Sequence, residues 1–273
     1  MMEDADIALV VALSEEFETI KGAIGLSPYK SEDGIEYFSV SDGATQCKLV
    51  AYTTNEMGLV PTVCATDMLL DRINPKWLIS IGLSGQLSTD CALGDVVIGT
   101  DCDLAFSEAR LSVGGIDFAG KPYEVPGLQD FHKTVNLKKY LQGREPDIPL
   151  AAQKALDERR LWRKYPHIHS GCICSTDFVV DNPKAKALLL EKNRRYLCTD
   201  MESAALVSAA RKRKFAGRIA VIRAVSDPAD GTKKKIDELA GRNTIRHYAM
   251  RNAATLLKHA IIEVAGNAEE QNR

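Results

Sequence analysis

The segment Thr199–Asp230 constrains the fold more than any other part of the chain. Its first half, Asp200–Lys214, has the spacing of apolar residues typical of a helix. Arg218–Val225 follows after a short turn, and its continuous apolar character is typical of a strand covered on both faces. Glu202 lies near the start of the helix and Asp227 follows the strand, so we expect the two acids to face one cleft.

The same alternation of buried strands and helices recurs along the chain, and it predicts an α/β sandwich around a largely buried, mixed sheet. We expect the helix after the first strand to be capped by Ser14. Strands are expected at residues 6–13, 35–40, 46–53, 77–81, 94–100, 168–174 and 196–198, and helices at about 14–25, 60–72, 183–192 and 243–264.

Residues 101–165 interrupt this pattern with glycines and prolines and then a charged helix around 150–164. Structureless loops of this length are unusual inside a compact domain, so we interpret the excursion as a lid or a subunit contact. The strand expected at Ile168–Cys174 returns to buried character. We therefore interpret residues 1–273 as one domain.

The composition excludes several classes of protein. The net charge of −2 argues against a protein that binds nucleic acid or an anionic membrane surface, because such proteins carry a basic excess. No apolar run approaches the roughly 20 residues that span a bilayer. The acidic start of the chain does not resemble a signal peptide, and the seven cysteines have no framework spacing. We expect a cytoplasmic protein.

One cluster of metal-ligating residue types has to be weighed. It consists of His167, His169, Cys172 and Cys174, which alternate along one expected strand. Their spacing suits no common zinc site, so core packing is the favoured interpretation and no metal is expected.

Each candidate acid has a structural and a functional interpretation. Glu202, Glu15 and Glu16 all lie in the first turn of an expected helix, where the helix dipole favours a negative charge. Functionally, a carboxylate at 202 has the acceptor capacity to bind both hydroxyls of a ribose diol. One of the acids at 15 and 16 would orient and deprotonate a water. Two carboxylates directly after a strand would repel an attacking phosphate, so water is the favoured nucleophile.

Asp227 ends a buried strand, the place where ligands bind in α/β sheets. Partial burial would raise its pKa and allow it to donate a proton near neutral pH. The structural alternative is a turn-forming aspartate before Pro228.

Glycine and lysine patterns give weaker signals. Gly82–Gly85 is not followed by the Gly-Lys-Ser/Thr of a Walker loop, so we expect a tight turn after the strand, with backbone contact to a ligand as the second interpretation. The basic run Lys233–Lys235 is typical of a solvated face, although it lies close to the proposed cleft and would meet an anionic substrate group there.

Taken together, these residues resemble the purine nucleoside phosphorylase superfamily, and within it the methylthioadenosine/S-adenosylhomocysteine nucleosidases. The most specific motifs are Asp-Met-Glu at 200–202 and Arg-x-x-Ser-Asp at 223–227. Further motifs that carry the resemblance are VVALSEEF, Met57-Gly58, IGLSGQL, GDVVIG, EVPG with Phe131, and SGCICSTDFVV.

The resemblance implies a three-layer α/β/α sandwich with a central mixed, twisted sheet, a homodimer, a small purine nucleoside as substrate, and no metal or cofactor. It implies that Glu16 activates the hydrolytic water and that Asp227 protonates the purine. The remaining implied substrate contacts are Glu202 on the ribose hydroxyls, Met201 on the sugar, Phe178 and Val180 at the base, Met57 near the 5′ substituent, and Ser226 and Arg223 as supports.

The sequence departs from the family pattern at three places. Leu83 replaces a serine or threonine near the water, Gln86 replaces a small residue, and Asp177 lies one position away from the usual aspartate before Phe178.

The function that follows is hydrolytic release of a purine, most simply adenine, from a nucleoside with a 5′ substituent. One alternative is an N-glycosidase for 5′-phosphorylated purine nucleotides, supported by Lys233–Lys235, Arg242 and Arg246. A phosphorylase and a purine-sensing module without catalysis also stay open.

Overall fold

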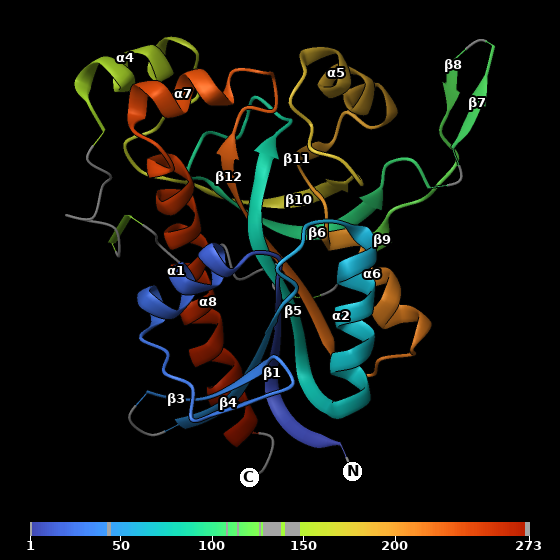
Figure 1. Cartoon of the computed structure of the whole chain (residues 1–273), viewed down its shortest axis with the longest axis vertical. Helices are drawn as coiled ribbons and strands as arrows, with labels where there is room; N and C mark the ends of the chain where they lie inside the picture. The colour runs from blue at the N-terminus through green and yellow to red at the C-terminus, as the bar shows by residue number, and fades with distance from the viewer. Residues whose placement is uncertain are drawn as a thin grey trace.

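A computed structural model describes residues 2–42, 45–107, 109–113, 115–125, 127, 138–139 and 148–270 (Figure 1). The strands are β1 (Glu3–Val11), β2 (Lys30–Glu32), β3 (Ile35–Asp42), β4 (Thr45–Thr53), β5 (Ile73–Gln86), β6 (Val96–Leu104), β7 (Arg110–Ser112), β8 (Gly115–Asp117), β9 (Tyr123–Glu124), β10 (Ile168–Ser175), β11 (Tyr196–Asp200) and β12 (Arg218–Asp227). The helices are α1 (Ser14–Ile24), α2 (Leu59–Arg72), α4 (Leu150–Glu158), α5 (Pro183–Lys192), α6 (Ser203–Lys212), α7 (Lys233–Ala240) and α8 (Thr244–Glu270).

The main sheet is mixed and has the order β11-β10-β6-β12-β5-β1-β4-β3-β2. Its centre is β5, whose Ile79 is level with Leu9 of β1 and Ala220 of β12, both in parallel pairing. β12 also pairs antiparallel with β6. At its far end β5 pairs antiparallel with β11, so this part of the sheet closes on itself around the carboxyl ends of β5 and β12.

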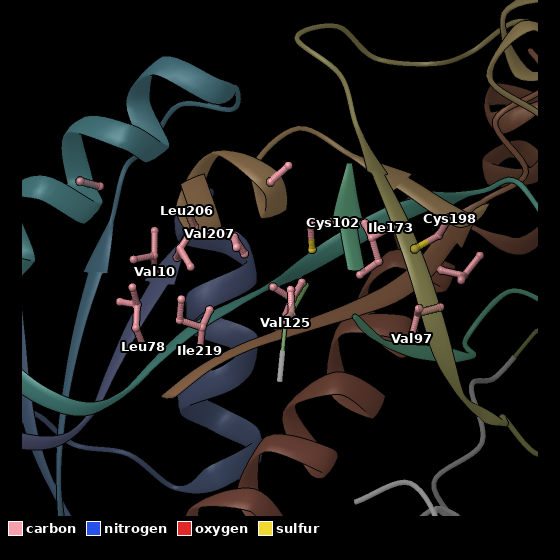
Figure 2. Close-up of a cluster of buried hydrophobic side chains, with 14 of the residues drawn as sticks. Val10, Leu78, Val97, Cys102, Val125, Ile173, Cys198, Leu206, Val207 and Ile219 are labelled. Atoms are coloured by element: carbon pink, nitrogen blue, oxygen red, sulfur yellow. The ribbon is translucent and has the colours of Figure 1, made fainter. Parts of the chain in front are cut away.

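Two helical layers cover this sheet, as the predicted sandwich requires. α2 and α6 pack together on one side, and their Leu69 and Leu206 belong to one buried apolar cluster. Figure 2 shows part of this cluster, including Leu206. α1 and α8 pack together on the other side, where Ile20 and Leu257 belong to a second cluster. We call these the α2–α6 layer and the α1–α8 layer. The three-layer α/β/α prediction is confirmed.

Part of the excursion joins the core instead of forming only a loop. β9 pairs with β6, and Val125, directly after β9, is completely buried in the cluster beneath α6. β7 and β8 form a separate two-stranded hairpin that projects from the body of the molecule (Figure 1). The predicted helix at 150–164 is shorter and ends at Glu158. Pro126 and Phe131, named in the predicted motif, lie outside the described residues.

Two local predictions were wrong, and one helix was not predicted. Gly82–Gln86 is not a turn, because β5 continues through it and pairs there with β12 and β11. Ser14 does not cap α1, since its hydroxyl donates a hydrogen bond to the side chain of Asn55 and the cap position is Leu13. The segment Lys233–Ala240 is a helix that the sequence reading did not include.

Among the described residues, no helix combines the length and the apolar character that crossing a bilayer requires.

Candidate active site

A pocket lies where the carboxyl ends of β5, β11 and β12 meet the first turn of α1 and the residues just before α2 and α6. The sequence-predicted residues in its wall are Glu16, Met57, Phe178, Val180, Met201, Glu202, Ser226 and Asp227. Arg223 does not reach the wall. It lies beneath the wall with 1% of its surface exposed. The wall also includes residues that the predicted site did not contain, among them Asp200, Thr199, Lys233 and Arg246.

Glu202 occupies the position directly before α6, where it is 8% exposed. Its Oε1 accepts a hydrogen bond from the backbone N–H of Gly58 at 3.3 Å, and its Oε2 accepts from the N–H of Met201 at 3.4 Å. Burial raises the pKa of Glu202 to about 7, although the nearby Arg223 guanidinium opposes the shift. Glu202 therefore exchanges its proton near neutral pH.

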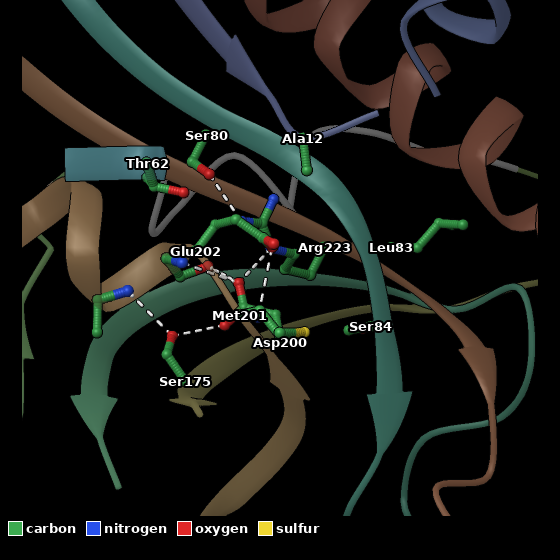
Figure 3. Close-up of polar contacts among 12 residues, drawn as sticks. Ala12, Thr62, Ser80, Leu83, Ser84, Ser175, Asp200, Met201, Glu202 and Arg223 are labelled. Carbon is green, nitrogen blue, oxygen red and sulfur yellow. Dashed lines mark hydrogen bonds and ion pairs between the residues drawn. The ribbon is translucent and has the colours of Figure 1, made fainter. Parts of the chain in front are cut away.

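Beneath Glu202, a buried ion pair anchors the site (Figure 3). The Nε of Arg223 donates to Asp200 Oδ2 at 2.5 Å, and its Nη2 donates to Ser80 Oγ at 2.7 Å. The same Nη2 lies 3.7 Å from Glu202 Oε2. Asp200 in turn accepts from Ser175 Oγ at 2.5 Å and from the N–H of Ser203 at 3.0 Å.

The sequence reading did not assign a role to Asp200 or Ser80. A signal existed for both, because each is a polar residue within or directly next to an otherwise apolar strand. Polar groups in such places are buried only when they have hydrogen-bond partners. Their partner, Arg223, comes from a different strand, and that pairing is not visible in local sequence patterns.

Glu16 lies in the first turn of α1 and is 6% exposed. Its Oε1 faces the backbone N–H of Leu83 at 3.4 Å, whereas its Oε2 is buried without a hydrogen-bond partner among the described residues. Burial raises the pKa of this carboxyl, and Arg223 and Arg246 act against the shift. The contact with residue 83 is made by the main chain, so a leucine in place of serine or threonine preserves it.

Asp227 is the last residue of β12, directly after an irregularity in the pairing with β5 between Val225 and Asp227. Its Oδ1 accepts from the N–H of Ala229 at 3.0 Å, and its Oδ2 accepts from Ser226 Oγ at 3.3 Å. Burial raises the pKa of Asp227, and the charge of Lys233 opposes the increase. The arrangement favours a carboxyl that still holds its proton at a pH where exposed aspartates have lost theirs.

Two glycines of β5 allow side chains to approach its backbone closely. A Cβ atom at Gly82 would lie 3.0 Å from Arg223 Nη1 and 3.3 Å from Glu16 Oε2. At Gly85 it would lie 3.0 Å from Ala229 Cβ and 3.2 Å from Asp227 Oδ1. The groups that approach these glycines include the acids Glu16 and Asp227 of the pocket, whereas the sequence had predicted a turn or contact with a ligand.

Gln86, a departure from the family pattern, links the pocket to α5. Its amide donates to the carbonyl of Cys91 at 2.5 Å, and its Oε1 accepts from Lys186 Nζ at 3.3 Å. The same ammonium donates to the carbonyl of Pro228 at 2.9 Å. Burial lowers the pKa of Lys186, and the nearby carboxylates of Asp230 and Asp227 resist that change. Lys186 thus connects β5 to the residue that follows Asp227.

The shifted aspartate at 177 also has a contact of its own. Its Oδ1 accepts from the N–H of Leu59 at 3.2 Å, at the first residue of α2. The next residue, Phe178, is 46% exposed and its ring lies 5.5 Å from that of Phe106. Met57 is 50% exposed at the pocket wall.

The histidines and cysteines that were weighed as metal ligands have other surroundings. His169 Nε2 lies 2.8 Å from Asp95 Oδ2, while Cys172 and Cys174 are buried in an apolar cluster. Within the described part of the chain, no group of three or more histidine, cysteine, aspartate or glutamate residues is arranged to hold a metal ion.

The sequence comparisons agree on one family. A model of the phosphorylase superfamily matches residues 6–262. The 5′-methylthioadenosine/S-adenosylhomocysteine nucleosidase of Psychromonas ingrahamii is 25% identical over 257 residues, which cover 93% of this chain and 97% of that protein. The enzyme of the same name from Bacillus pumilus is 24% identical over 223 residues, which cover 82% and 86%.

Solved structures show the same fold. The 5′-methylthioadenosine/S-adenosylhomocysteine nucleosidase of Helicobacter pylori with butyl-thio-DADMe-Immucillin-A has a TM-score of 0.65 and 18% identity, covering 96% of this chain and 99% of that one. The futalosine hydrolase of Helicobacter pylori has a TM-score of 0.63 and 16% identity, covering 96% and 98%.

Proposed function

Because this chain belongs to the phosphorylase superfamily, we propose that it is a hydrolase that cleaves the N-glycosidic bond of a purine nucleoside and releases the free base. The nucleoside carries a 5′ substituent, and adenine is the base. The observation that carries this proposal is the convergence of Glu16, Glu202 and Asp227 on one pocket from three separate elements.

The chemistry assigns a different task to each acid. Cleavage builds positive charge on the ribosyl ring and negative charge on the departing base, so one acid has to protonate the base while another prepares water on the opposite side. Asp227, with its raised pKa, supplies the proton to the purine N7. Glu16 Oε2, buried without a partner among the described residues, has the free acceptor that an attacking water needs. General acid and general base catalysis contribute on the order of 10²–10⁴-fold each.

The other pocket residues bind and orient the substrate. Glu202 accepts hydrogen bonds from the ribose O2′ and O3′ hydroxyls, and Met201 packs against the sugar. Phe178 stacks on the base with Val180 beside it, and Met57 covers the 5′ side. Arg223 and Ser226 do not need to contact the substrate in this scheme, since their hydrogen bonds support Asp200 and Asp227.

Free-base release tests the proposal directly. The protein is incubated with adenosine, methylthioadenosine and S-adenosylhomocysteine, with and without inorganic phosphate, and adenine is measured by chromatography. Adenine formation without phosphate supports hydrolysis. Release that requires phosphate would point to a phosphorylase, and tight adenine binding without turnover of any nucleoside or nucleotide would point to a sensor.

We also propose that the protein acts in the cytoplasm as a homodimer. The exposed apolar side chains of Met57 and Val60, which are 50% and 67% exposed beside the pocket, support a subunit contact there. All seven cysteines are free thiols and six of them are buried, which suits a reducing compartment. Light scattering coupled to size-exclusion chromatography tests the dimer, and a monomer at micromolar concentration would contradict it.

A further inference from the structure

The nature of the 5′ substituent is left open by the proposed function, and two cations in the pocket wall bear on it. Lys233 is the first residue of α7 and Arg246 lies in the first turn of α8. The other basic residues of this region, Lys234, Lys235 and Arg242, are exposed and do not line the pocket. Of the basic residues in this region, Lys233 and Arg246 are therefore the two whose side chains line the pocket.

The position of these cations follows from how the ribose is held. Glu202, which binds the ribose diol, belongs to the α2–α6 layer. The C5′ atom is carried by C4′, the ring carbon next to C3′, and it leaves the sugar ring on the face opposite to O2′ and O3′. A ribose with its diol on Glu202 thus directs its 5′ substituent away from Glu202. Among the described residues, the cationic side chains in the pocket wall are Lys233 of α7 and Arg246 of α8.

Both cations have unused hydrogen-bonding capacity. Lys233 Nζ lies 3.8 Å from Asp227 Oδ2, too far for a hydrogen bond, and donates none within the described residues. Arg246 Nη2 donates to Glu15 Oε1 at 2.5 Å, but a guanidinium has five N–H donors. The Glu15 side chain is 49% exposed, so it can turn toward water when another anion takes its place.

A structural role explains the basic stretch poorly. Three successive lysines occupy the first turn of α7, where the helix dipole disfavours positive charge, and that turn contains no acid. α7 is held to the rest of the protein by buried Ile236 and Ala240 on its opposite portion. An anion bound at Lys233 would offset the unfavourable charge of this turn.

We propose, building on the function proposed above, that the substrate is a purine nucleoside 5′-phosphate whose phosphate is bound by Lys233 and Arg246. A phosphate monoester carries a charge of about −1.5 to −2 at pH 7, which matches two cations. A methylthio group is neutral, and a homocysteine group is a zwitterion without net charge, so neither matches two cations as a phosphate does. Water attacks C1′, the bond from C1′ to the base nitrogen breaks, Glu16 takes the water proton and Asp227 supplies the base proton. The products are the free purine and ribose 5-phosphate.

The test compares substrates in one assay of adenine release with adenosine, methylthioadenosine, S-adenosylhomocysteine, AMP and ATP. We expect a kcat/KM for AMP or ATP at least about tenfold above that for the uncharged nucleosides, because charge-assisted hydrogen bonds to phosphate are the strong ones. In the double variant K233Q/R246Q, the ratio of kcat/KM for the nucleotide to that for adenosine should fall about tenfold or more. The ratio is used because Lys233 also lies beside Asp227 and its loss affects every substrate.

The matched control is K234Q/R242Q, which removes the same charge from neighbouring exposed residues and should leave the ratio within about twofold, as expected for screened surface charges. An equal fall in the ratio of kcat/KM for the nucleotide to that for adenosine in both double variants would overturn the proposal. A higher kcat/KM for methylthioadenosine or S-adenosylhomocysteine than for the nucleotides would also overturn it. Adenine release from uncharged nucleosides alone would sink only this inference. No adenine from any of the five compounds would sink the proposed function itself.

Discussion

At the scale of single residues, the three acids of the pocket share one electrostatic feature. Burial raises the pKa of Glu16, Glu202 and Asp227 above the ordinary value of each carboxyl. Their surroundings differ, however, because Arg223 acts on Glu16 and Glu202, whereas Asp227 has Lys233 and backbone or hydroxyl donors. Surroundings that give neighbouring carboxyls different pKa values commonly allow one to act as the acid and another as the base.

The first prediction concerns Asp227→Asn. The amide keeps the hydrogen bond from the N–H of Ala229 but cannot donate an acid proton, so adenine release should fall by about 10²–10⁴-fold. Asp237→Asn, on α7 and outside the pocket wall, is the control and should keep its activity. Adenine release is measured together with a thermal melt. A folded Asp227→Asn protein with wild-type turnover would refute the role of Asp227.

The second prediction concerns Glu202→Gln and the pH dependence of stability. The pKa of Glu202 rises from 4.5 in the unfolded chain to about 7 in the folded one, so between these values the folded protein binds more protons. This group therefore makes the free energy of unfolding decrease as pH rises through that window. Glutamine has no charge to bury, so the variant should be more stable than wild type at pH 8, by up to about 3 kcal/mol.

Urea unfolding at pH 5 and pH 8 provides the measurement. Near pH 5 the folded wild-type carboxyl is largely protonated and the two proteins should differ little. The variant should also lose activity, since the amide replaces the carboxylate that accepts both ribose hydroxyls. A variant that is equally or less stable than wild type at pH 8 would contradict the pKa of Glu202.

At the scale of elements, the segment directly after β12 follows the proposed acid, Asp227, and is held by contacts from α5 and from the residue that follows α4. Lys186 of α5 donates to the carbonyl of Pro228, and Arg159, next to α4, donates to Asp230 Oδ2 at 2.6 Å. Ala229, between them, is completely buried with a left-handed φ of 52°. A non-glycine residue in that conformation persists only where its surroundings hold it, so the placement of Asp227 depends on elements distant in the sequence.

The third prediction is that Lys186→Met lowers kcat about tenfold or more, because a small misplacement of a catalytic group is costly. The change removes an ammonium near Asp227, so the alkaline limb of the pH–rate profile should move to higher pH. Lys186→Arg should restore part of the activity. Lys184→Met, an exposed position on the same helix, is the control. An unchanged pH profile in Lys186→Met would rule out a positioning role.

At the scale of the whole molecule, Arg223 joins strands that are far apart in the sequence. It lies on β12 and contacts Ser80 of β5 and Asp200 of β11, where the sheet closes on itself. A buried charge of this kind is tolerated because its guanidinium is paired and hydrogen-bonded. The same group lowers the cost of ionising Glu16 and Glu202, so the stability of the fold and the electrostatics of the pocket share one residue.

The fourth prediction compares two arginine substitutions. Arg223→Met leaves Asp200 buried without its ion-pair partner and should cost about 3–5 kcal/mol in the free energy of unfolding. Arg213→Met removes an arginine whose ion pairs with Asp67 and Asp71 are exposed, and it should cost no more than about 1 kcal/mol. Urea titrations followed by circular dichroism measure both. Similar losses in the two variants would show that the Arg223 network is not a central support.

Predictions that depended on neighbouring residues succeeded, whereas those that depended on contacts between distant parts of the sequence failed. α5 begins and ends at the predicted residues, because Pro183 at its first position and Asn182 as its cap are local signals. β5 extends beyond its apolar run through Gly82–Gln86 because pairing with β11 and β12 holds it there. α7 was missed because its three leading lysines are unfavourable for a helix start and its buried contacts lie elsewhere in the chain.

The sequence alone determined the alternation of strands and helices and the placement of acids at element ends. Apolar periodicity and the residues that begin or end a helix are local properties, so both can be recognised from neighbouring residues. Only the tertiary structure decided that Arg223 lies beneath the pocket, that Asp200 and Ser80 bind it, and that Lys233 and Arg246 line the wall. Burial and charge proximity depend on residues brought together across the whole fold, and these contacts set the pKa values on which the proposed chemistry depends.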